Sequence, residues 1–279
     1  MPGPDPPPAK VNLQFSAEEP PHARVQRNAH EWRVLNDSYV ANVARTGLLL
    51  DWIEGFSPDF IDSDFWPSWK ESRPNLPQEV DDIITNWERR GIIKRVDRRE
   101  VKACSPIFAI PKKETGQFRL ITNLRGLNAF LHTTYFHLPS LQKICPFLQQ
   151  GHWGASIDIK DAYLHWPISE RDKPILCFEY LGKYFQHQSL PFGLAVAPRE
   201  WQRAMQAVVK YMRQKGATIW VYLDDFLILG ATKEVVAEKV AILLDLLAKL
   251  GLEVNFAKSE LNPTQNIRYL GFQLNLEGG

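Results

Sequence analysis

From residue 77 onward, the spacing of hydrophobic positions predicts three amphipathic helices. The segment 77–90 starts with a proline and several acidic residues, which favour the first turn of a helix. The segments 198–215 and 233–250 each place apolar side chains on one face at helical spacing. All three segments end next to a glycine, the residue that most readily adopts the left-handed conformation that closes a helix.

Short runs rich in β-branched and aromatic residues predict strands between and after these helices. They are 105–110, 118–122, 155–159, 176–180, 184–188, 218–229, 252–256 and 267–274. The polar segment PKKETGQ after the first run predicts a hairpin with a basic tip, and Leu181-Gly182-Lys183 predicts a second hairpin. Helices and strands do not alternate strictly, which favours an α+β fold with an antiparallel sheet covered by helices.

The first 75 residues show no such periodicity. Five prolines fall in the first eight residues, so 1–30 is predicted to be an extended or disordered tail. Residues 31–75 are aromatic but irregular, which favours loops packed against a core. The aromatic residues are Trp32, Trp52, Phe56, Phe60, Phe65, Trp66 and Trp69. The predicted organisation is therefore a tail (1–30), an extension of unassigned role (31–78) and one folded domain (79–277).

Composition limits the class of protein without identifying it. Of 279 residues, 44% are hydrophobic and 23% charged, as in ordinary globular proteins. The net charge of +1 neither supports nor excludes a nucleic-acid partner, because basic residues can cluster on one face. Three scattered cysteines lack zinc-ligand spacing, and no apolar run approaches the ~20 residues that span a bilayer. We expect an intracellular chain that does not enter a membrane; nucleus and cytoplasm are not distinguished.

Two adjacent acidic residues, Asp224 and Asp225, interrupt the apolar run IWVYLDDFLILG. Carboxylates in such surroundings are costly unless a cation or another partner compensates their charge. One explanation is a hairpin whose two-residue turn is Asp-Asp. The other is a metal site, and on this segment alone the two explanations are equally good.

Asp158 favours the metal site, because it also lies inside an apolar, strand-like run, ASIDIKDAYLHWPI. A hairpin and a helix are predicted between Asp158 and Asp224, enough chain to bring their strands side by side. Three converging carboxylates suit Mg²⁺, with Mn²⁺ as a substitute. Two such ions can stabilise the attacking and leaving oxygens of a phosphoryl transfer.

Six segments, in chain order, resemble the reverse transcriptase family. They are FRLITNLRGLN (118–128), DIKDAY (158–163), LPFGLAVAPREWQ (190–202), YLDD (222–225), LGLEVNFAKSE (250–260) and YLGFQLN (269–275). A single YxDD is weak evidence, whereas six ordered segments are strong. The resemblance covers about 79–277. The amino-acid sequences of these segments most resemble those of retrotransposon enzymes and, within these, of the DIRS-like (tyrosine-recombinase) group.

This resemblance implies a right-hand polymerase fold. The fingers would comprise about 79–157 and a hairpin near 166–196, and the palm 158–165 and 197–277. Most of the thumb is expected to be absent. The implied enzyme is an RNA-directed DNA polymerase, a nucleotidyltransferase that uses two Mg²⁺ ions, an RNA template, a DNA or RNA primer and dNTPs.

The resemblance also implies roles for individual residues. The metal would be ligated by Asp158, Asp224 and Asp225. The incoming nucleotide would be gripped at its triphosphate by Arg119 with Lys112 or Lys113, met at its phosphates by the backbone of Asp161 and Ala162, and checked for a 2′-hydroxyl by Tyr163; Phe192 and Gly193 would lie by the templating pair, and Lys258 would protonate pyrophosphate. The primer end would lie beside Tyr222, and part of the primer grip would be formed by Tyr269, Leu270 and Gly271. Without the resemblance, a surface ion pair for Arg119, a core position for Tyr163 and a solvated side chain for Asp161 would each be as good or better. A solvated side chain for Lys258 would be nearly as good.

The sequence departs from the family at three positions and leaves two other functions open. Asn123 stands where relatives often have Asp, and His165 and Trp166 are unusual after the first aspartate motif. A non-catalytic nucleic-acid-binding remnant of a mobile element is the first alternative. An RNA-directed RNA polymerase is the second; it is disfavoured by Tyr163 and by YLDD in place of Gly-Asp-Asp.

Overall fold

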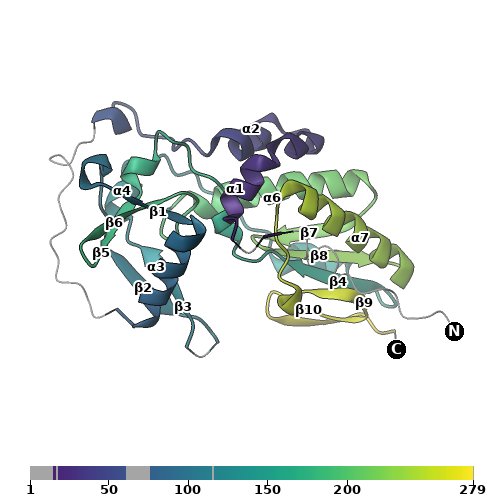
Figure 1. Ribbon diagram of the computed structural model, residues 1–279. Coiled ribbons are helices and arrows are strands. Elements are labelled where there is room, and N and C mark those ends of the chain that lie inside the picture. The colour runs from purple at the N-terminus through teal and green to yellow at the C-terminus, as the bar shows by residue number, and fades with distance from the viewer. Residues whose placement is uncertain (1–14, 17, 61–75, 115, 279) are drawn as a thin grey trace.

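A computed structural model describes residues 15–16, 18–60, 76–114 and 116–278 (Figure 1). Its α-helices are α1 (Pro21–Arg27), α2 (Ser38–Thr46), α3 (Glu79–Arg90), α4 (Arg125–Asn128), α5 (Leu141–Ile144), α6 (Ala197–Gln214) and α7 (Lys233–Leu250). Its strands are β1 (Ile93–Val96), β2 (Ile107–Pro111), β3 (Phe118–Thr122), β4 (Trp153–Asp158), β5 (Cys177–Tyr180), β6 (Lys183–His187), β7 (Thr218–Tyr222), β8 (Asp225–Gly230), β9 (Glu260–Thr264), β10 (Asn266–Tyr269) and β11 (Phe272–Asn275).

The larger sheet is antiparallel, with strand order β7-β8-β4-β9. Helices α6 and α7 cover one face, and the hairpin β10–β11 packs on the other (Figure 1). Along β8, Phe226 and Ile228 belong to the core under the helices, whereas Leu227 and Leu229 belong to the core under β10–β11. Because β8 is buried on both faces, its sequence is a continuous apolar run rather than an alternating one.

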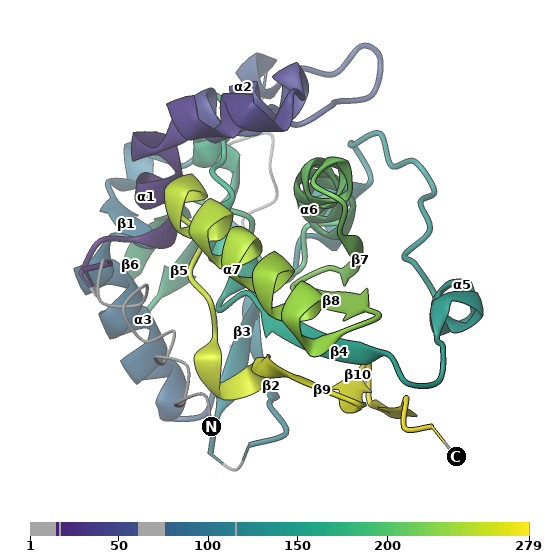
Figure 2. The same ribbon diagram turned by 90° about the vertical axis from the view of Figure 1, so that its right-hand side faces the viewer.

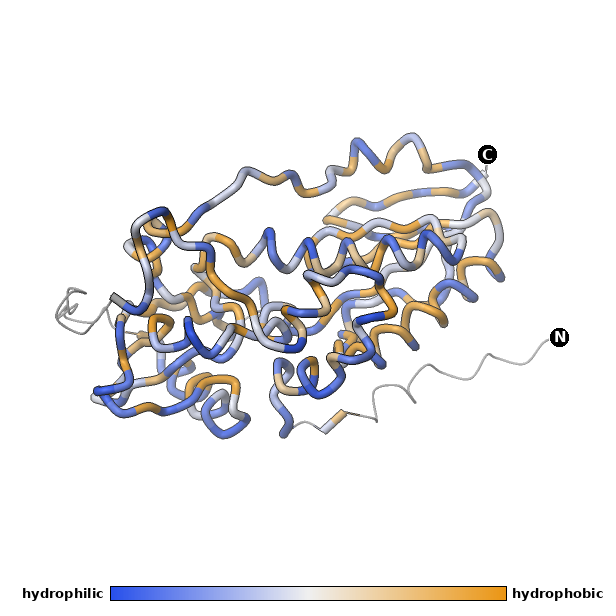
Figure 3. The backbone as a smooth tube through the Cα atoms, turned by 90° about the horizontal axis from the view of Figure 1, so that it is seen from above, coloured by the Kyte–Doolittle hydropathy of each residue, from blue (hydrophilic) through white to orange (hydrophobic). Residues whose placement is uncertain are grey.

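Helix α7 shows how the sequence sets the limits of an element. Thr232 caps its first turn by accepting a hydrogen bond from the backbone N–H of Val235, and Gly251 closes it in the left-handed conformation at φ 81°. The predicted helix 233–250 is therefore confirmed at both ends, and α3 and α6 lie where the spacing predicted them. Figure 3 shows hydrophobic and hydrophilic positions alternating along the long helices.

A second group of elements is built around the three-stranded sheet β1-β6-β5, with the hairpin β2–β3 and helix α3 beside it. Its core joins Ile84 of α3 to Leu120 of β3 and to the stacked rings of Phe178 and Phe185. Both predicted hairpins, β2–β3 and β5–β6, are confirmed. The second turns at Leu181 and Gly182, which both have positive φ, as a tight two-residue turn requires.

Three predicted strands differ from the structure. The run 218–229 is the hairpin β7–β8, and its turn is Leu223-Asp224 rather than Asp-Asp. The run 252–256 makes only an isolated bridge, Val254 with Ile159. The run 267–274 is divided into β10 and β11 because Leu270 and Gly271 adopt positive φ and reverse the chain.

The N-terminal predictions are corrected most. Residues 21–30 are not an extended tail, because α1 begins at Pro21 and is followed by a 3-10 helix, Ala29–Leu35. Residues 29–46 are largely helical rather than loops, although the expected packing is present: Trp32 is fully buried, and its Nε1 donates to the carbonyl of Leu250 at 3.0 Å. Figure 2 shows α1 beside the C-terminal end of α7. Residues 1–14 and the aromatic residues Phe65, Trp66 and Trp69 lie outside the described part.

None of the helices in the described ranges is both long and apolar enough to cross a membrane.

Candidate active site

Three aspartates meet at one end of the larger sheet. β4 ends at Asp158 and β8 begins at Asp225, and the two residues are directly paired across the strands. Asp224 lies in the β7–β8 turn, where its carbonyl accepts a hydrogen bond from the N–H of Ile159 at 2.7 Å. Two segments that are remote in sequence are thus joined at the position of the acidic residues.

The turn that carries Asp224 is held by two side chains of α6. Leu223 adopts φ 53°, which costs a non-glycine residue about 1–2 kcal/mol. Its N–H donates to Gln202 Oε1 at 2.7 Å, and its carbonyl accepts from Trp201 Nε1 at 3.0 Å. Gln202 Nε2 also donates to the carbonyl of Val221 at 3.0 Å. These bonds fix the turn and offset its strain.

Backbone groups of the two paired aspartates are also held. Asp158 N–H donates to Ser259 Oγ at 2.9 Å, and the hydroxyl of Tyr269 donates to the carbonyl of Asp225 at 2.9 Å. Tyr269 is only 1% exposed, and its ring packs against Leu227 and Leu229 of β8. Its expected part in a primer grip stays a prediction. Leu270 and Gly271 form the tip of β10–β11.

The carboxylates are electrostatically unfavourable without a cation. Burial, reinforced by Asp158 and Asp224, raises the pKa of Asp225 to about 8. Burial and then Asp224 raise the pKa of Asp158 to about 7, and burial also raises the pKa of Asp224. Lys258 opposes the shift at Asp158 and Asp224. A cluster of oxygen donors with unbalanced negative charge is the chemistry that fits hard divalent ions.

The donor set fits divalent ions by its chemistry, although its present side-chain arrangement does not form a ligand cage. In the described part of the chain, no three Asp, Glu, His or Cys side chains are grouped closely enough to hold one ion. The paired backbone positions of Asp158 and Asp225 already set the strands side by side.

These shifts predict how the stability of the metal-free protein depends on pH. Asp158 and Asp225 keep their protons in the folded state up to pKa values of about 7 and 8, whereas unfolded aspartates lose them near 3.8. The free energy of unfolding therefore decreases as the pH rises from 4 to 8, and the melting temperature should fall across that range. At pH 8, Asp225→Asn should be more stable than the wild type by about 1–2 kcal/mol, a value reduced for solvent screening.

Thermal denaturation at a series of pH values, with and without Mg²⁺, measures this effect. Mg²⁺ should raise the melting temperature of the wild type at pH 8 and have little effect on Asp225→Asn. A wild-type melting temperature that stays constant between pH 4 and 8, or an Asn variant less stable than the wild type, would contradict the assignment.

A row of three side chains lies beside the carboxylates. The guanidinium of Arg119, on β3, lies 4.7 Å from the ring centre of Phe192, and that ring lies 5.0 Å from the ring of Tyr163. Arg119 partly opposes the rise in the pKa of Asp224 that burial causes, which places its positive charge within reach of the site. Burial, then Asp224, raises the pKa of Tyr163 to about 12, so its hydroxyl stays neutral. Lys112 and Lys113 are exposed near the tip of β2–β3.

Gly193 allows this row to form. It has φ 109°, and a Cβ there would lie 1.9 Å from the carbonyl oxygen of Thr122. The adjacent carbonyl of Phe192 accepts a hydrogen bond from Thr122 N–H at 2.9 Å. The backbone at Gly193 therefore approaches β3 closely, which only a residue without a Cβ allows.

The turn after Asp158 is also strained. Asp161 adopts φ 49°, and its carbonyl accepts hydrogen bonds from Leu164 N–H at 3.0 Å and from His165 Nδ1 at 3.2 Å. Ala162 begins the short 3-10 helix that leads to His165. Tyr222 ends β7, opposite Asp225.

Several residues that build this site were given no such role from the sequence. Trp201, Gln202 and Ser259 were given no individual role. Trp201 and Gln202 lie inside the segment LPFGLAVAPREWQ and Ser259 inside LGLEVNFAKSE, and these segments are the one signal that pointed to them.

Comparisons with known proteins agree with this architecture. A family model described as "Reverse transcriptase (RNA-dependent DNA polymerase)" matches residues 110–274, more than half of the chain. The chain is 25% identical over 205 residues to the Transposon Tf2-3 polyprotein of Schizosaccharomyces pombe. That match covers 74% of this chain but only 15% of the polyprotein, and the Tf2-7 polyprotein matches at 24% identity over the same length.

Two solved structures resemble the fold. The foamy viral protease-reverse transcriptase in complex with double-stranded DNA matches with a TM-score of 0.67 and 16% identity, over 90% of this chain and 46% of that one. The foamy viral protease-reverse transcriptase in complex with an RNA/DNA hybrid matches with a TM-score of 0.62 and 19% identity, over 74% of this chain and 27% of that one. The α+β fold with antiparallel sheets predicted from the sequence is confirmed.

Proposed function

Because this chain belongs to the reverse transcriptase (RNA-dependent DNA polymerase) family, we propose that it adds deoxynucleotides to a primer 3′ end as directed by an RNA template. The observation that carries the proposal is the meeting of Asp158, Asp224 and Asp225 at one sheet end, beside the row of Arg119, Phe192 and Tyr163. The DNA and RNA/DNA hybrid bound by the foamy viral structures supports a primer–template as the partner.

In this proposal the three carboxylates hold two Mg²⁺ ions, for which Mn²⁺ can substitute. When bound, the ions would help to ionise the primer hydroxyl and balance the charge on the departing pyrophosphate. Arg119, with Lys112 or Lys113, would grip the triphosphate, and Lys258 would protonate the pyrophosphate. The fixed turn at Leu223 and the fixed strand end at Asp158 keep the carboxylates in position, so that little reorganisation is needed during the reaction.

Primer extension by the purified chain, with RNA and DNA templates tested separately, is the direct test. Extension on RNA that depends on Mg²⁺ and releases pyrophosphate is expected. Binding of primer–template without any extension would instead support the alternative, a nucleic-acid-binding remnant of a mobile element. The three intact carboxylates favour the enzyme.

We propose further that the chain comes from a retrotransposon, which its similarity to the Tf2 polyproteins supports. The narrower assignment to the DIRS-like group rests on the amino-acid sequences of the segments DIKDAY, LPFGL and YLDD. The reading frame around the coding sequence tests both: continuation into thumb and RNase H segments supports a retrotransposon polyprotein, and a neighbouring tyrosine recombinase supports the DIRS-like group.

Tyr163 should set the preference for deoxynucleotides. Its ring is held against Phe192, where it would meet a 2′-hydroxyl of an incoming nucleotide. Tyr163→Ala should raise ribonucleotide incorporation relative to deoxynucleotide incorporation by about tenfold to a hundredfold. Tyr163→Phe, which keeps the ring, is the matched control and should keep the preference. The ratio of kcat/KM for the two nucleotides measures the effect, and an unchanged ratio in Tyr163→Ala would exclude this role.

A further inference from the structure

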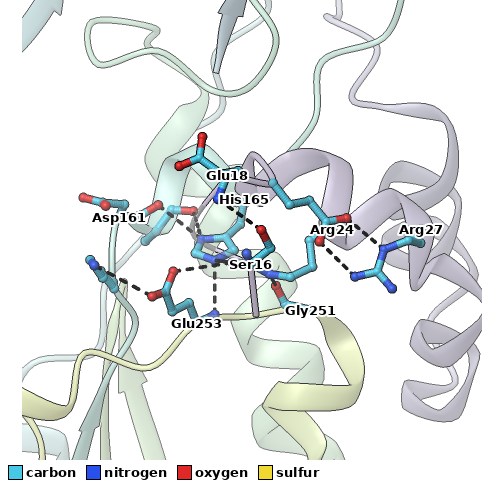
Figure 4. Close-up of polar contacts among 11 residues, drawn as sticks. Ser16, Glu18, Arg24, Arg27, Asp161, His165, Gly251 and Glu253 are labelled. Carbon is cyan, nitrogen blue, oxygen red and sulfur yellow. Dashed lines mark hydrogen bonds and ion pairs between the residues drawn. The ribbon is translucent and has the colours of Figure 1, made fainter. Parts of the chain in front are cut away.

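The N-terminal helix α1 carries an arginine that is buried in the body of the protein. Arg24 is only 1% exposed, and a buried guanidinium is costly unless its N–H groups and its charge are paired. Its Nε donates to the carbonyl of Gly251 at 2.8 Å, and its terminal nitrogen lies 3.6 Å from a carboxylate oxygen of Glu253. The same terminal nitrogen lies 3.3 Å from Nε2 of His165 (Figure 4).

The partners of His165 determine which of its ring nitrogens carries the hydrogen. Nε2 faces two donors, Arg24 at 3.3 Å and the backbone N–H of Glu253 at 3.2 Å, so it must accept. Nδ1 therefore carries the hydrogen, and it faces the carbonyls of Asp161 at 3.2 Å and Ala162 at 3.3 Å. Burial, reinforced by Arg24, lowers the pKa of His165 to about 3, which keeps the ring neutral.

The two carbonyls belong to the strained turn between Asp158 and Tyr163. Asp161 is left-handed at φ 49°, a conformation that persists only where its surroundings hold it. Glu253 provides a second contact to the same turn, because its carbonyl accepts a hydrogen bond from the N–H of Lys160 at 2.9 Å. The hydrogen bonds thus run from α1 through one imidazole to the backbone beside the carboxylates, as Figure 4 shows.

We propose that Arg24 is a positioning residue for the nucleotide-binding turn 159–163, acting through His165 on the carbonyls of Asp161 and Ala162. This inference rests on the proposed polymerase function. It adds to that function a segment that lies outside residues 110–274, the part matched by the family model. It also explains the imidazole at His165, an unusual residue after the first aspartate motif.

Other contacts also hold the chain at α1, so we expect the helix to stay attached when Arg24 is changed. Trp32, just after α1, is fully buried and bonded to Leu250. The backbone of Arg24 packs directly on Gly251, where an added Cβ would lie 3.0 Å from the Arg24 carbonyl oxygen.

The test compares steady-state primer extension by Arg24→Met, His165→Asn and the double variant. Asn can still donate to the turn but lacks the Nε2 that Arg24 meets. Arg24→Met should raise the KM for dNTP about tenfold, the size expected for one lost hydrogen bond from a charged group, and change kcat much less. It should also weaken the selection against ribonucleotides, because Tyr163 is the last residue of the turn. Arg27→Met is the matched control on the same helix: Arg27 is largely exposed and pairs with Glu19, so its KM should match the wild type.

The double variant separates positioning from a general loss of stability. If Arg24 acts through His165, adding Arg24→Met to His165→Asn should raise KM no further. Additive effects, or a KM and nucleotide selection that stay at wild-type values in Arg24→Met, would overturn the inference while leaving the polymerase function standing. If Arg24→Met does not fold, His165→Asn alone decides, and a wild-type KM in it overturns the inference. Absence of extension by the wild type on either template would reject the proposed function and this inference with it.

Discussion

Replacing Asp225 by Asn will lower the rate of primer extension by about a thousandfold or more, because the variant loses one of three carboxylates proposed to hold the metal ions. Asn has nearly the same shape as Asp and can remain at the start of β8, opposite Asp158. The loss should therefore appear in kcat, with the fold intact. Single-nucleotide extension on an RNA template, with circular dichroism to check folding, measures both properties.

Asp245→Asn is the matched control for this variant. Asp245 lies on α7 in an exposed ion pair with Lys249, away from the sheet end, so extension should not change. Asp158→Asn should behave like Asp225→Asn. If Asp225→Asn keeps extension within a few-fold of the wild type, the three aspartates are not the catalytic centre, even though the fold is that of the family.

Gly193→Ala should cause the largest loss of stability, about 3–5 kcal/mol. A Cβ would lie 1.9 Å from the Thr122 carbonyl oxygen, a backbone atom that cannot move without displacing β3. Primer extension should fall as well, because displacement of the Phe192–Gly193 loop from β3 would separate Phe192 from Arg119 and Tyr163. Chemical denaturation measures the first effect and nucleotide KM the second.

Gly182→Ala separates backbone strain from steric overlap. Gly182 also has positive φ, at 77°, but nothing lies within 4 Å of an added Cβ. Its substitution should cost only about 1 kcal/mol, the cost of the left-handed conformation itself. Equal losses for the two variants would show that the Thr122 contact does not matter.

The elements that were predicted well are those whose signals are local. Helix α7 has its cap, its apolar stripe and its closing glycine within one stretch of 20 residues, 232–251. The hairpin β5–β6 is marked by its turn residues. The aspartates could be found because carboxylates within an apolar run have few explanations other than a turn or a cation.

The N-terminal helices could not be found in this way. α1 has only seven residues, too few to be stable in isolation, so packing of Arg24 and Val25 rather than helix propensity holds it. The prolines before it favoured an extended chain, yet Pro21 occupies the first helical position, where proline is well tolerated.

The residues that support the aspartates escaped prediction for a related reason. Gln202 and Tyr269 meet the hairpin from a separate helix and a separate strand, and Arg24 meets His165 across 141 positions of sequence. No periodicity encodes such contacts. They exist only when the chain is folded. Gln202 and Tyr269 bond to backbone atoms, which carry no sequence signature, and Arg24 bonds to a ring nitrogen of His165.

The burial of β8 on both faces has a consequence for folding. In most sheets a slip of one residue would turn polar side chains inward, and this penalty rejects the wrong pairing. Here such a slip would only exchange Phe226 and Ile228 for Leu227 and Leu229, one apolar set for another. Discrimination between alignments must therefore come from the strand ends, where Gln202, Trp201 and Tyr269 form hydrogen bonds with particular backbone groups of the β7–β8 hairpin. The contacts that hold the hairpin in the native state are therefore also expected to favour the native strand alignment during folding.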